Sequence, residues 1–305
     1  MADALPVLLD TDIGTNVDDA VALSYLLRQR RCELLGVTTV SGDVGKRAAL
    51  AEIVCRAAGR EDVPIHCGSP GPLLFGPGQP KVPHYEACRS RPHRTDRPAG
   101  TAVEFLRRTI RGRPGEVTLL TIGPFTNVAL LFATDPEVPA LLRRVVSMTG
   151  VFYPPAPGGR GDVETNARID PVAAAMVFAA PDRFGLAPDG CPRHLCVGLD
   201  VTMQCRLPAG EFRRRFARPP LDVVSEMGAG WLANRTDVVF HDPLAAAVVF
   251  RPELCEYEDG RVAVDVTPDD PRAGRTNFSP GPGPHRVARG VDAQGFFDEF
   301  FSRFD

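Results

Sequence analysis

Short apolar runs alternate with amphipathic segments along most of the 305-residue chain. The runs have the length of buried strands and are bounded by turn residues, and apolar positions recur at helical spacing between them. This alternation predicts a single α/β domain over residues 1–305, with a mostly parallel central sheet flanked by helices. The expected strands are 5–9, 33–40, 63–67, 116–122, 145–149, 195–201, 254–257, 262–266 and 286–288.

The expected helices begin near residues 18, 45, 101, 126, 171, 241 and 292, and residues 208–234 read as helices broken at Pro219-Pro220. The pattern fails between residues 68 and 98, where Pro, Gly and Arg are frequent. A segment of this length without regular structure is usually functional or disordered. Because it follows the end of an expected strand, a mobile lid over a site and a plain flexible insertion both remain open.

One stretch, residues 8–23 (LLDTDIGTNVDDAVAL), places Asp10 and Asp12 at a strand end and Asp18 and Asp19 at a helix start. The two helix-start residues also suit a capping role. Four carboxylates at the carboxyl end of one strand, however, repel one another unless a cation lies among them. The pattern therefore favours a site for a hard divalent cation, which prefers oxygen ligands.

Three further stretches carry polar residues beside a helix start: 123–127, 164–170 and 241–243. Together with the acidic stretch, they resemble the motifs of the inosine–uridine-preferring nucleoside hydrolases. DTDIGTNVDD is similar to the family's N-terminal signature, IGPFTNVALL to its Gly-Pro-x-Thr-Asn turn, ETNARIDPVAA to its Glu-x-Asn segment, HDPLAAA to its His-Asp-Pro motif, and VGLDVT to a further marker. The motifs occur in family order from Asp10 to about Asp292.

The resemblance implies a Rossmann-like nucleoside hydrolase fold and Ca²⁺-dependent hydrolysis of ribonucleosides to free base and ribose, as in purine and pyrimidine salvage. The implied Ca²⁺ ligands are the carboxylates of Asp12, Asp19 and Asp242 and the backbone carbonyl of Thr126. The implied substrate-binding residues are Asp18 and Asn166 at the ribose hydroxyls, Glu164 at the 5′ end, and Met148 and Asp242 beside the sugar. Asp10 would orient the loop.

The chemistry of these residues agrees with this role. Calcium takes six to eight oxygen ligands, so it can hold carboxylates, a carbonyl, the sugar diol and a water together. The ion lowers the pKa of that water, and Asp12 beside it is the best general base. Fixed carboxylates stabilise the oxocarbenium character of the breaking ribosyl bond. His241 is the nearest group that can supply a proton to the leaving base.

Several positions depart from the family pattern. Asp43 and Gly158 stand where the family usually has Asn, Thr165 replaces a common Phe, and the 68–98 segment lacks the usual His-Gly. Asp43 would add negative charge near the metal, and Gly158 would remove a 5′-hydroxyl contact. The base preference and the 5′ substituent of the substrate therefore stay open. Trp231 either stacks on a base or packs in the core or an interface.

Three other functions compete with this interpretation. A phosphohydrolase of the haloacid-dehalogenase class is disfavoured, because Thr15 is one place too late and no lysine follows Lys81. A phosphorylated riboside is an alternative substrate that a lid with Arg89, Arg91, Arg94 and Arg97 would recruit, although Glu164 would repel a 5′-phosphate. A non-catalytic nucleoside- or ribose-binding protein is the third alternative, but it would not need both Asp12 and His241.

Composition narrows the remaining classes. Charged residues make up 24% of the chain and the net charge is −3, so no basic surface points to nucleic acid or an anionic membrane. We expect no signal peptide and no membrane helix, hence a cytoplasmic protein. Abundant Arg suggests a bacterial source, and the family resemblance implies a homo-oligomer, either dimer or tetramer.

The eight cysteines are scattered and fit buried free thiols. Their tightest group is Cys191, His194, Cys196 and Cys205, and its spacing matches no zinc site.

Overall fold

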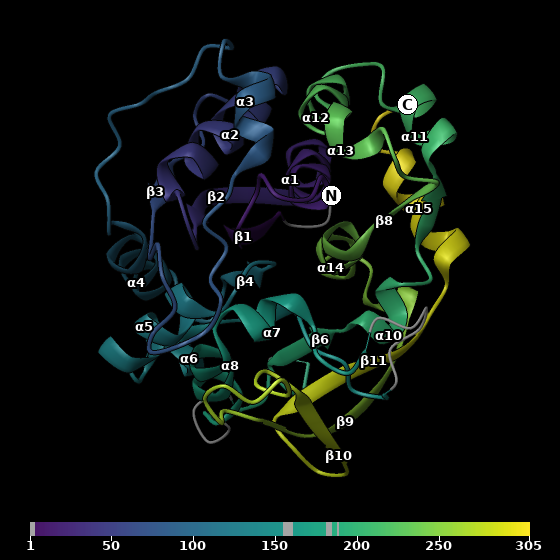
Figure 1. Cartoon of the computed structure of the whole chain (residues 1–305). Coiled ribbons are helices and arrows are strands. Elements are labelled where there is room, and N and C mark those ends of the chain that lie inside the picture. Colours follow the sequence, from purple (N-terminus) through teal and green to yellow (C-terminus); the bar gives the residue numbers. More distant parts are fainter. Residues whose placement is uncertain (1–3, 155–160, 181–184, 188) are drawn as a thin grey trace.

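The computed structural model describes residues 4–154, 161–180, 185–187 and 189–305 (Figure 1). Its central sheet has nine strands in the order β10-β9-β11-β6-β5-β4-β1-β2-β3. Seven of them run parallel, and β9 is antiparallel to both of its neighbours. The strands are β1 (Leu5–Thr11), β2 (Cys32–Thr39), β3 (Ile65–Cys67), β4 (Thr118–Thr121), β5 (Arg144–Met148), β6 (His194–Val197), β9 (Cys255–Val264), β10 (Thr276–Pro280) and β11 (His285–Val291).

Helices cover both faces of this sheet. They are α1 (Asp18–Arg28), α2 (Val44–Ala57), α3 (Pro83–Cys88), α4 (Ala102–Gly112), α5 (Thr126–Thr134), α6 (Val138–Leu141), α7 (Thr165–Ile169), α8 (Pro171–Phe178), α10 (Leu199–Thr202), α11 (Ala209–Arg215), α12 (Leu221–Met227), α13 (Ala229–Leu232), α14 (His241–Val248) and α15 (Ala293–Phe301). None of the helices in the described ranges has the length and apolarity that crossing a bilayer requires.

Alternate side chains of β1 enter two hydrophobic cores. Val7 and Leu9 pack with residues of α1, α2, α12, α14 and α15, whereas Leu8 packs with residues of α4, α5 and α8. All three side chains are fully buried. A strand buried on both faces reads as a continuous apolar run, which is why β1 is visible in the sequence.

The predicted α/β class with a mostly parallel sheet is confirmed, and the errors lie at the edges and in short elements. The segment 195–201 is not one strand, because β6 ends at Val197 and α10 follows. Both elements are buried and apolar, so periodicity does not separate them. The expected strands 254–257 and 262–266 are the single strand β9, and β10 was missed. Both are half-exposed antiparallel strands rich in polar residues.

The strand order places the site. Six strands follow the order β3-β2-β1-β4-β5-β6, so the chain winds away from β1 in both directions. In doubly wound sheets of this order, ligands bind outside the carboxyl ends of the strands where the winding reverses. The predicted acidic stretch, which contains Asp10, Asp12, Asp18 and Asp19, begins at the carboxyl end of β1.

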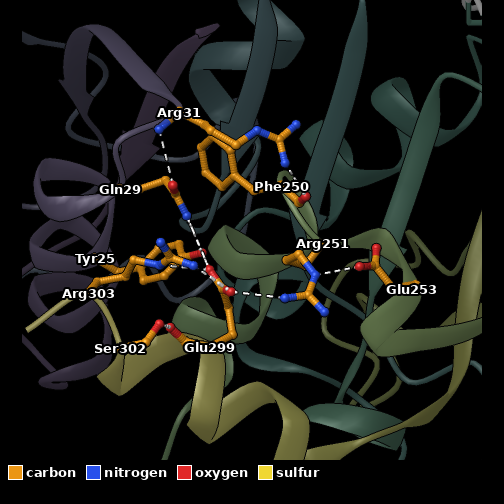
Figure 2. A network of polar contacts seen from close by, with 9 residues as sticks. All are labelled: Tyr25, Gln29, Arg31, Phe250, Arg251, Glu253, Glu299, Ser302 and Arg303. Carbon is orange, nitrogen blue, oxygen red and sulfur yellow. Dashed lines mark hydrogen bonds and ion pairs between the residues drawn. The ribbon is translucent and has the colours of Figure 1, made fainter. Parts of the chain in front are cut away.

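A buried carboxylate, Glu299 of α15, ties together the ends of three segments that lie far from each other in the sequence (Figure 2). It accepts hydrogen bonds from Tyr25 Oη at 2.9 Å and Gln29 Nε2 at 3.2 Å, both at the carboxyl end of α1. It also pairs with Arg303 at 2.7 Å and with Arg251, just after α14, at 3.1 Å. The network therefore fixes α1 and α14 at the ends opposite the cleft.

We predict that Glu299→Ala lowers the free energy of unfolding by about 3 kcal/mol, because it leaves Arg303 and the buried hydroxyl of Tyr25 without their carboxylate acceptor and removes one of the two acceptors of Arg251. Urea unfolding followed by circular dichroism measures this. Glu253→Gln is the matched control, since Glu253 pairs with the same Arg251 but is exposed. It should stay within about 0.5 kcal/mol of wild type. Equal effects of the two substitutions would contradict the assignment.

Candidate active site

A cleft of about 110 Å³ opens at the carboxyl ends of β1, β4 and β5, beside the first residues of α14. All but one of the site residues expected from the sequence line it. They are Asp12, Asp18, Asp19, Met148, Glu164, Asn166, His241 and Asp242. The exception is Thr126, which opens α5 at the end of the neighbouring strand β4 and is buried.

Four carboxylates converge at the floor of the cleft. Oxygens of Asp18, Asp19 and Asp242 lie within 4.8 Å of one another, and Asp12 lies close enough for its charge to raise the pKa of Asp18 and Asp19. Each of the four residues is at most 7% exposed. Burial raises the pKa of all four carboxyl groups, and repulsion from neighbouring carboxylates adds to the rise for Asp18, Asp19 and Asp242. Such a group can hold a metal ion.

The positions of these carboxylates follow from local structure. Asp18 and Asp19 are the first two residues of α1, and Asp242 is the second residue of α14, which packs against α1. The backbone N–H of Asp242 lies near the Asp18 carboxylate and lowers its pKa, opposing the effect of burial. The N-cap position of α1 is Val17, and no side chain caps this helix. The capping interpretation of Asp18 and Asp19 is therefore not supported, although both sit where the helix dipole favours negative charge.

Asp10 lies behind the cleft rather than in its wall. Its Oδ1 accepts hydrogen bonds from Thr38 at 2.5 Å and from Asn127 Nδ2 at 2.7 Å, so it links β1 to β2 and α5. Burial raises its pKa to about 7. Its Oδ2 has no hydrogen-bond partner within the described part of the chain. Next to it, Thr11 donates to Asp19 at 2.5 Å and orients that carboxylate from below.

Glu164 both caps α7 and lines the cleft. Its Oε1 accepts from the backbone N–H of Asn166 at 2.8 Å. Its Oε2 accepts from Ala167 N at 3.1 Å and from Gly150 N and Thr149 Oγ1 at 3.2 Å each. Burial raises the pKa of this carboxyl, and the backbone N–H donors oppose the rise. The carboxylate therefore has a fixed orientation toward the cleft.

Asn166 bridges two strands. Its amide nitrogen donates to the carbonyl of Ile122 at 2.8 Å and of Met148 at 3.0 Å, at the ends of β4 and β5. Both amide hydrogens are used in this way, which leaves Oδ1 as the atom that can accept a hydrogen bond from a ligand hydroxyl. Thr126 is held differently, because its hydroxyl donates to Asp170 at 2.7 Å. The expected role of the Thr126 carbonyl stays a prediction.

His241 is the first residue of α14 and is half-buried. Its Nδ1 lies 2.7 Å from the hydroxyl of Thr202, at the end of α10. When that hydroxyl donates, the proton of the ring sits on Nε2. Thr202 is a site residue that sequence reasoning did not single out, although it is the last residue of the VGLDVT motif.

The 68–98 segment contains α3 and is hydrogen-bonded to the core. Ser69 N donates to Asn127 at 2.9 Å, and His84 N donates to the carbonyl of Gly14 at 3.2 Å. Between these anchors, Gln79 forms part of the cleft wall. The segment therefore borders the site, whereas its interpretation as a lid stays a prediction.

The four arginines of this segment do not line the cleft in the described part of the chain. Each is paired with a carboxylate: Arg89 with Glu86, Arg91 with Glu226, Arg94 with Asp96 and Arg97 with Glu52. The structure gives no support to recruitment of a phosphorylated substrate by these side chains.

The departures from the family pattern have separate outcomes. Asp43 is exposed, caps α2 through the backbone N–H of Lys46 at 3.0 Å and does not line the cleft, so the expected charge beside the metal is absent from the cleft wall. Gly158 lies outside the described residues.

Trp231 borders a smaller adjoining cavity, donates to Asn16 at 3.1 Å and lies under the Arg235 guanidinium.

A second buried group joins His194, Cys196 and His285 on one face of β6 and β11. The ring atoms form a chain in which Ser147 Oγ lies 2.9 Å from His194 Nε2, the two Nδ1 atoms are 3.2 Å apart, and His285 Nε2 lies 3.0 Å from the carbonyl of Phe178. Two neutral tautomers satisfy every contact in this chain. Cys191 and Cys205 are not members of the group, and the histidines act as core hydrogen-bonding residues.

Comparison with known proteins identifies the family of this chain. The family model described as inosine-uridine preferring nucleoside hydrolase matches residues 7–298. The chain is 32% identical over 282 residues to the pyrimidine-specific ribonucleoside hydrolase RihA of Klebsiella pneumoniae, covering 86% of this chain and 85% of that one. It is 31% identical over 284 residues to the non-specific ribonucleoside hydrolase RihC of Salmonella newport, with 87% and 85% covered.

A solved structure of a purine-preferring ribonucleoside hydrolase from Gardnerella vaginalis superimposes with a TM-score of 0.79 at 25% identity, covering 98% of this chain and 97% of that chain. The protein is therefore a hydrolase that acts on N-glycosyl bonds. It belongs to the inosine-uridine preferring nucleoside hydrolase family, as the sequence motifs predicted.

The buried carboxyls predict a pH dependence of stability in the presence of a chelator. Burial raises the pKa of Asp18 from 3.8 to about 7, so over that range the folded protein holds a proton that the unfolded chain releases. This contribution is complete below pH 3.8 and is lost as the pH rises toward 7, at about 1.4 kcal/mol per pH unit. Asp18→Asn removes this loss of stability, because the asparagine side chain does not titrate.

We therefore expect the stability of Asp18→Asn relative to wild type to increase between about pH 4.5 and 7 and to level off above that range. Urea midpoints measured at a series of pH values give this difference directly. A difference that does not change with pH would show that Asp18 titrates as an ordinary carboxyl.

Proposed function

We propose that this protein hydrolyses the N-glycosidic bond of ribonucleosides with a bound Ca²⁺ ion, yielding free base and ribose. The observation that supports this most is the convergence of Asp12, Asp18, Asp19 and Asp242 in a buried cleft. Four such carboxylates repel one another unless a cation lies among them. An all-oxygen donor set suits calcium.

The donor set proposed for the ion is Asp12, Asp19, Asp242 and the carbonyl of Thr126. Asp10 lies behind these four residues, on the side away from the cleft, and adds negative charge to the site. Its Oδ2 is buried and has no partner among the described residues. When bound, the ion would supply an electrostatic field that positions a water and lowers its pKa.

Asp12 is the proposed general base. In the reaction, the oxygen of water bonds to the anomeric carbon, the bond from that carbon to the base nitrogen breaks, and Asp12 takes the proton of the water. Burial raises the pKa of the Asp12 carboxyl, which increases its affinity for a proton, and the charge of Arg47 opposes the rise. Asp18 and Glu164 are fixed negative groups near the sugar, and they stabilise the positive charge that develops on it.

Substrate positioning uses groups that are already oriented. Asn166 offers Oδ1 to a ribose hydroxyl, Asp18 accepts from another, and Glu164 faces the 5′ end. Met148 provides an apolar contact beside the sugar. His241 is the proposed general acid: as the imidazolium it donates from Nδ1 to the Thr202 hydroxyl, which orients the ring, and transfers the proton on Nε2 to the leaving base.

Two alternatives are less well supported. A binding protein for nucleosides does not require both a candidate general base, Asp12, and a candidate general acid, His241, in its cleft. A phosphorylated riboside would meet Glu164 at its 5′ end. The relatives include pyrimidine-specific, non-specific and purine-preferring enzymes, so the base preference stays open. A role in salvage, a cytoplasmic location, a bacterial source and a dimeric or tetrameric assembly stay predictions.

Incubation with a panel of purine and pyrimidine ribonucleosides and a nitrophenyl riboside tests the proposal. We expect equal amounts of free base and ribose, loss of activity with a chelator, and recovery with Ca²⁺. Asp12→Ala should lower kcat at least about 1,000-fold, since it removes both base and ligand. Saturable binding without turnover in the wild type would indicate a binding protein, and release of phosphate from phosphorylated ribosides would indicate the other alternative.

The role of His241 predicts a dependence on the leaving group. His241→Ala should lower kcat for nucleosides about 100-fold or more, because the departing base needs a proton. The same substitution should change kcat for the nitrophenyl riboside less than about threefold, because nitrophenolate leaves as a stable anion. Thr202→Val should give a weaker form of the same pattern. Equal losses on both substrates would assign His241 to binding rather than to proton transfer.

A further inference from the structure

Arg47 is an arginine of α2 that is fully buried directly beneath the cleft. Its Nε donates to the carbonyl of Ser41 at 2.6 Å, and its Nη1 donates to the carbonyls of Asp12 and Ile13. Its Nη2 donates to both oxygens of Gln79, at 2.9 Å for the backbone and 2.8 Å for the side chain. The five N–H groups of a guanidinium are thus all used, and every acceptor is an uncharged oxygen.

This arrangement determines how the Gln79 amide points. Its Oε1 faces Arg47, so Nε2 is the group that remains to donate. Gln79 and Asp12 line the same cleft, and the Gln79 side chain lowers the pKa of the Asp12 carboxyl, which is the effect of a nearby N–H donor; Nε2 is therefore the group that faces Asp12. Arg47 therefore acts on Asp12 in two ways. It donates directly to the backbone carbonyl of Asp12, and it orients the Gln79 amide that faces the Asp12 carboxylate.

Two glycines show that residues 79–82 are fitted closely to the loops below them. At Gly42, which has a φ of +67°, a Cβ would lie 2.2 Å from the backbone oxygen of Gln79. At Gly14, which has a φ of +120°, a Cβ would lie 2.5 Å from Cγ1 of Val82. Both loops lack a side chain at the point where the 68–98 segment crosses them, so the segment can approach Asp12.

We infer that Arg47 and Gln79 are positioning residues that orient the Asp12 carboxylate, and that Gln79 brings this contact from the 68–98 segment. The inference rests on the proposed function, because it assigns a role toward the proposed base and metal ligand. Neither residue touches the reacting atoms. A partner that orients a metal-binding carboxylate typically contributes 10- to 100-fold to metal affinity or activity.

Two substitutions of Gln79 separate its contacts. Gln79→Leu can contact neither Arg47 nor Asp12, so we expect about tenfold weaker Ca²⁺ binding and a 10- to 100-fold lower kcat with KM changed less than about threefold. Gln79→Glu keeps an acceptor for Arg47 and adds negative charge, but it has no N–H for Asp12. It should lower kcat similarly while binding Ca²⁺ at least as tightly as the wild type does.

The measurements are steady-state kinetics and calorimetric titration of the substrate-free protein with Ca²⁺ alone. Lys81→Ala is the matched control, because Lys81 is an exposed residue of the same segment. Arg47→Lys supplies a second readout. Each loss in kcat is converted to an activation free energy. If the two residues act through one contact, the value for the double variant Arg47→Lys/Gln79→Leu will be smaller than the sum of the values for the two single variants.

The outcomes distinguish this inference from the proposed function. If the wild type hydrolyses nucleosides but both Gln79 variants match Lys81→Ala in kcat and in Ca²⁺ affinity, the inference is wrong and the function stands. If the wild type binds Ca²⁺ but hydrolyses no nucleoside, the proposed function is wrong, while weaker Ca²⁺ binding by Gln79→Leu alone still supports the orienting contact. If the wild type does neither, both are wrong.

Discussion

Electrostatic repulsion among buried carboxylates is the constraint on which this structure depends. Asp12, Asp18, Asp19 and Asp242 are held close together where burial raises the pKa of each. The groups that oppose the repulsion come from all sides. The hydroxyl of Thr11 donates to Asp19, the backbone N–H at the start of α14 favours the ionised form of Asp18, and Arg47 supplies a positive charge that interacts with Asp12 and Asp19. At the far ends of α1 and α14, the Glu299 network keeps the two helices together against this repulsion.

The sequence predicts the members of the acidic group well, because they occupy positions that topology brings together. Asp12 follows a strand buried on both faces, and Asp242 enters an apolar helix. Both patterns are local, and the carboxyl ends of parallel strands meet at one edge. For Asp18 and Asp19, the sequence pattern fits both a metal site and a helix-capping role. The structure does not support the capping role, because Val17 occupies the cap position of α1.

The sequence does not single out Arg47, Gln79 or Thr202, because their contacts at the site follow no motif or spacing. Arg47 donates to backbone carbonyls, including that of Gln79, and any residue type can supply a carbonyl. Thr202 contacts His241 from a helix that was predicted as part of a strand. Glu164 shows a related limit, because a residue that the sequence assigns only to substrate binding also caps α7.

The two edges of the sheet have a consequence for assembly. At one edge, β3 has only three residues, and at the other, β10 is largely exposed and ends in Pro280, which has no N–H to offer. Short edge strands and prolines both prevent a further strand from adding. Both features therefore disfavour a continuous sheet across two copies, and they leave the strand register that sets the cleft independent of neighbouring molecules.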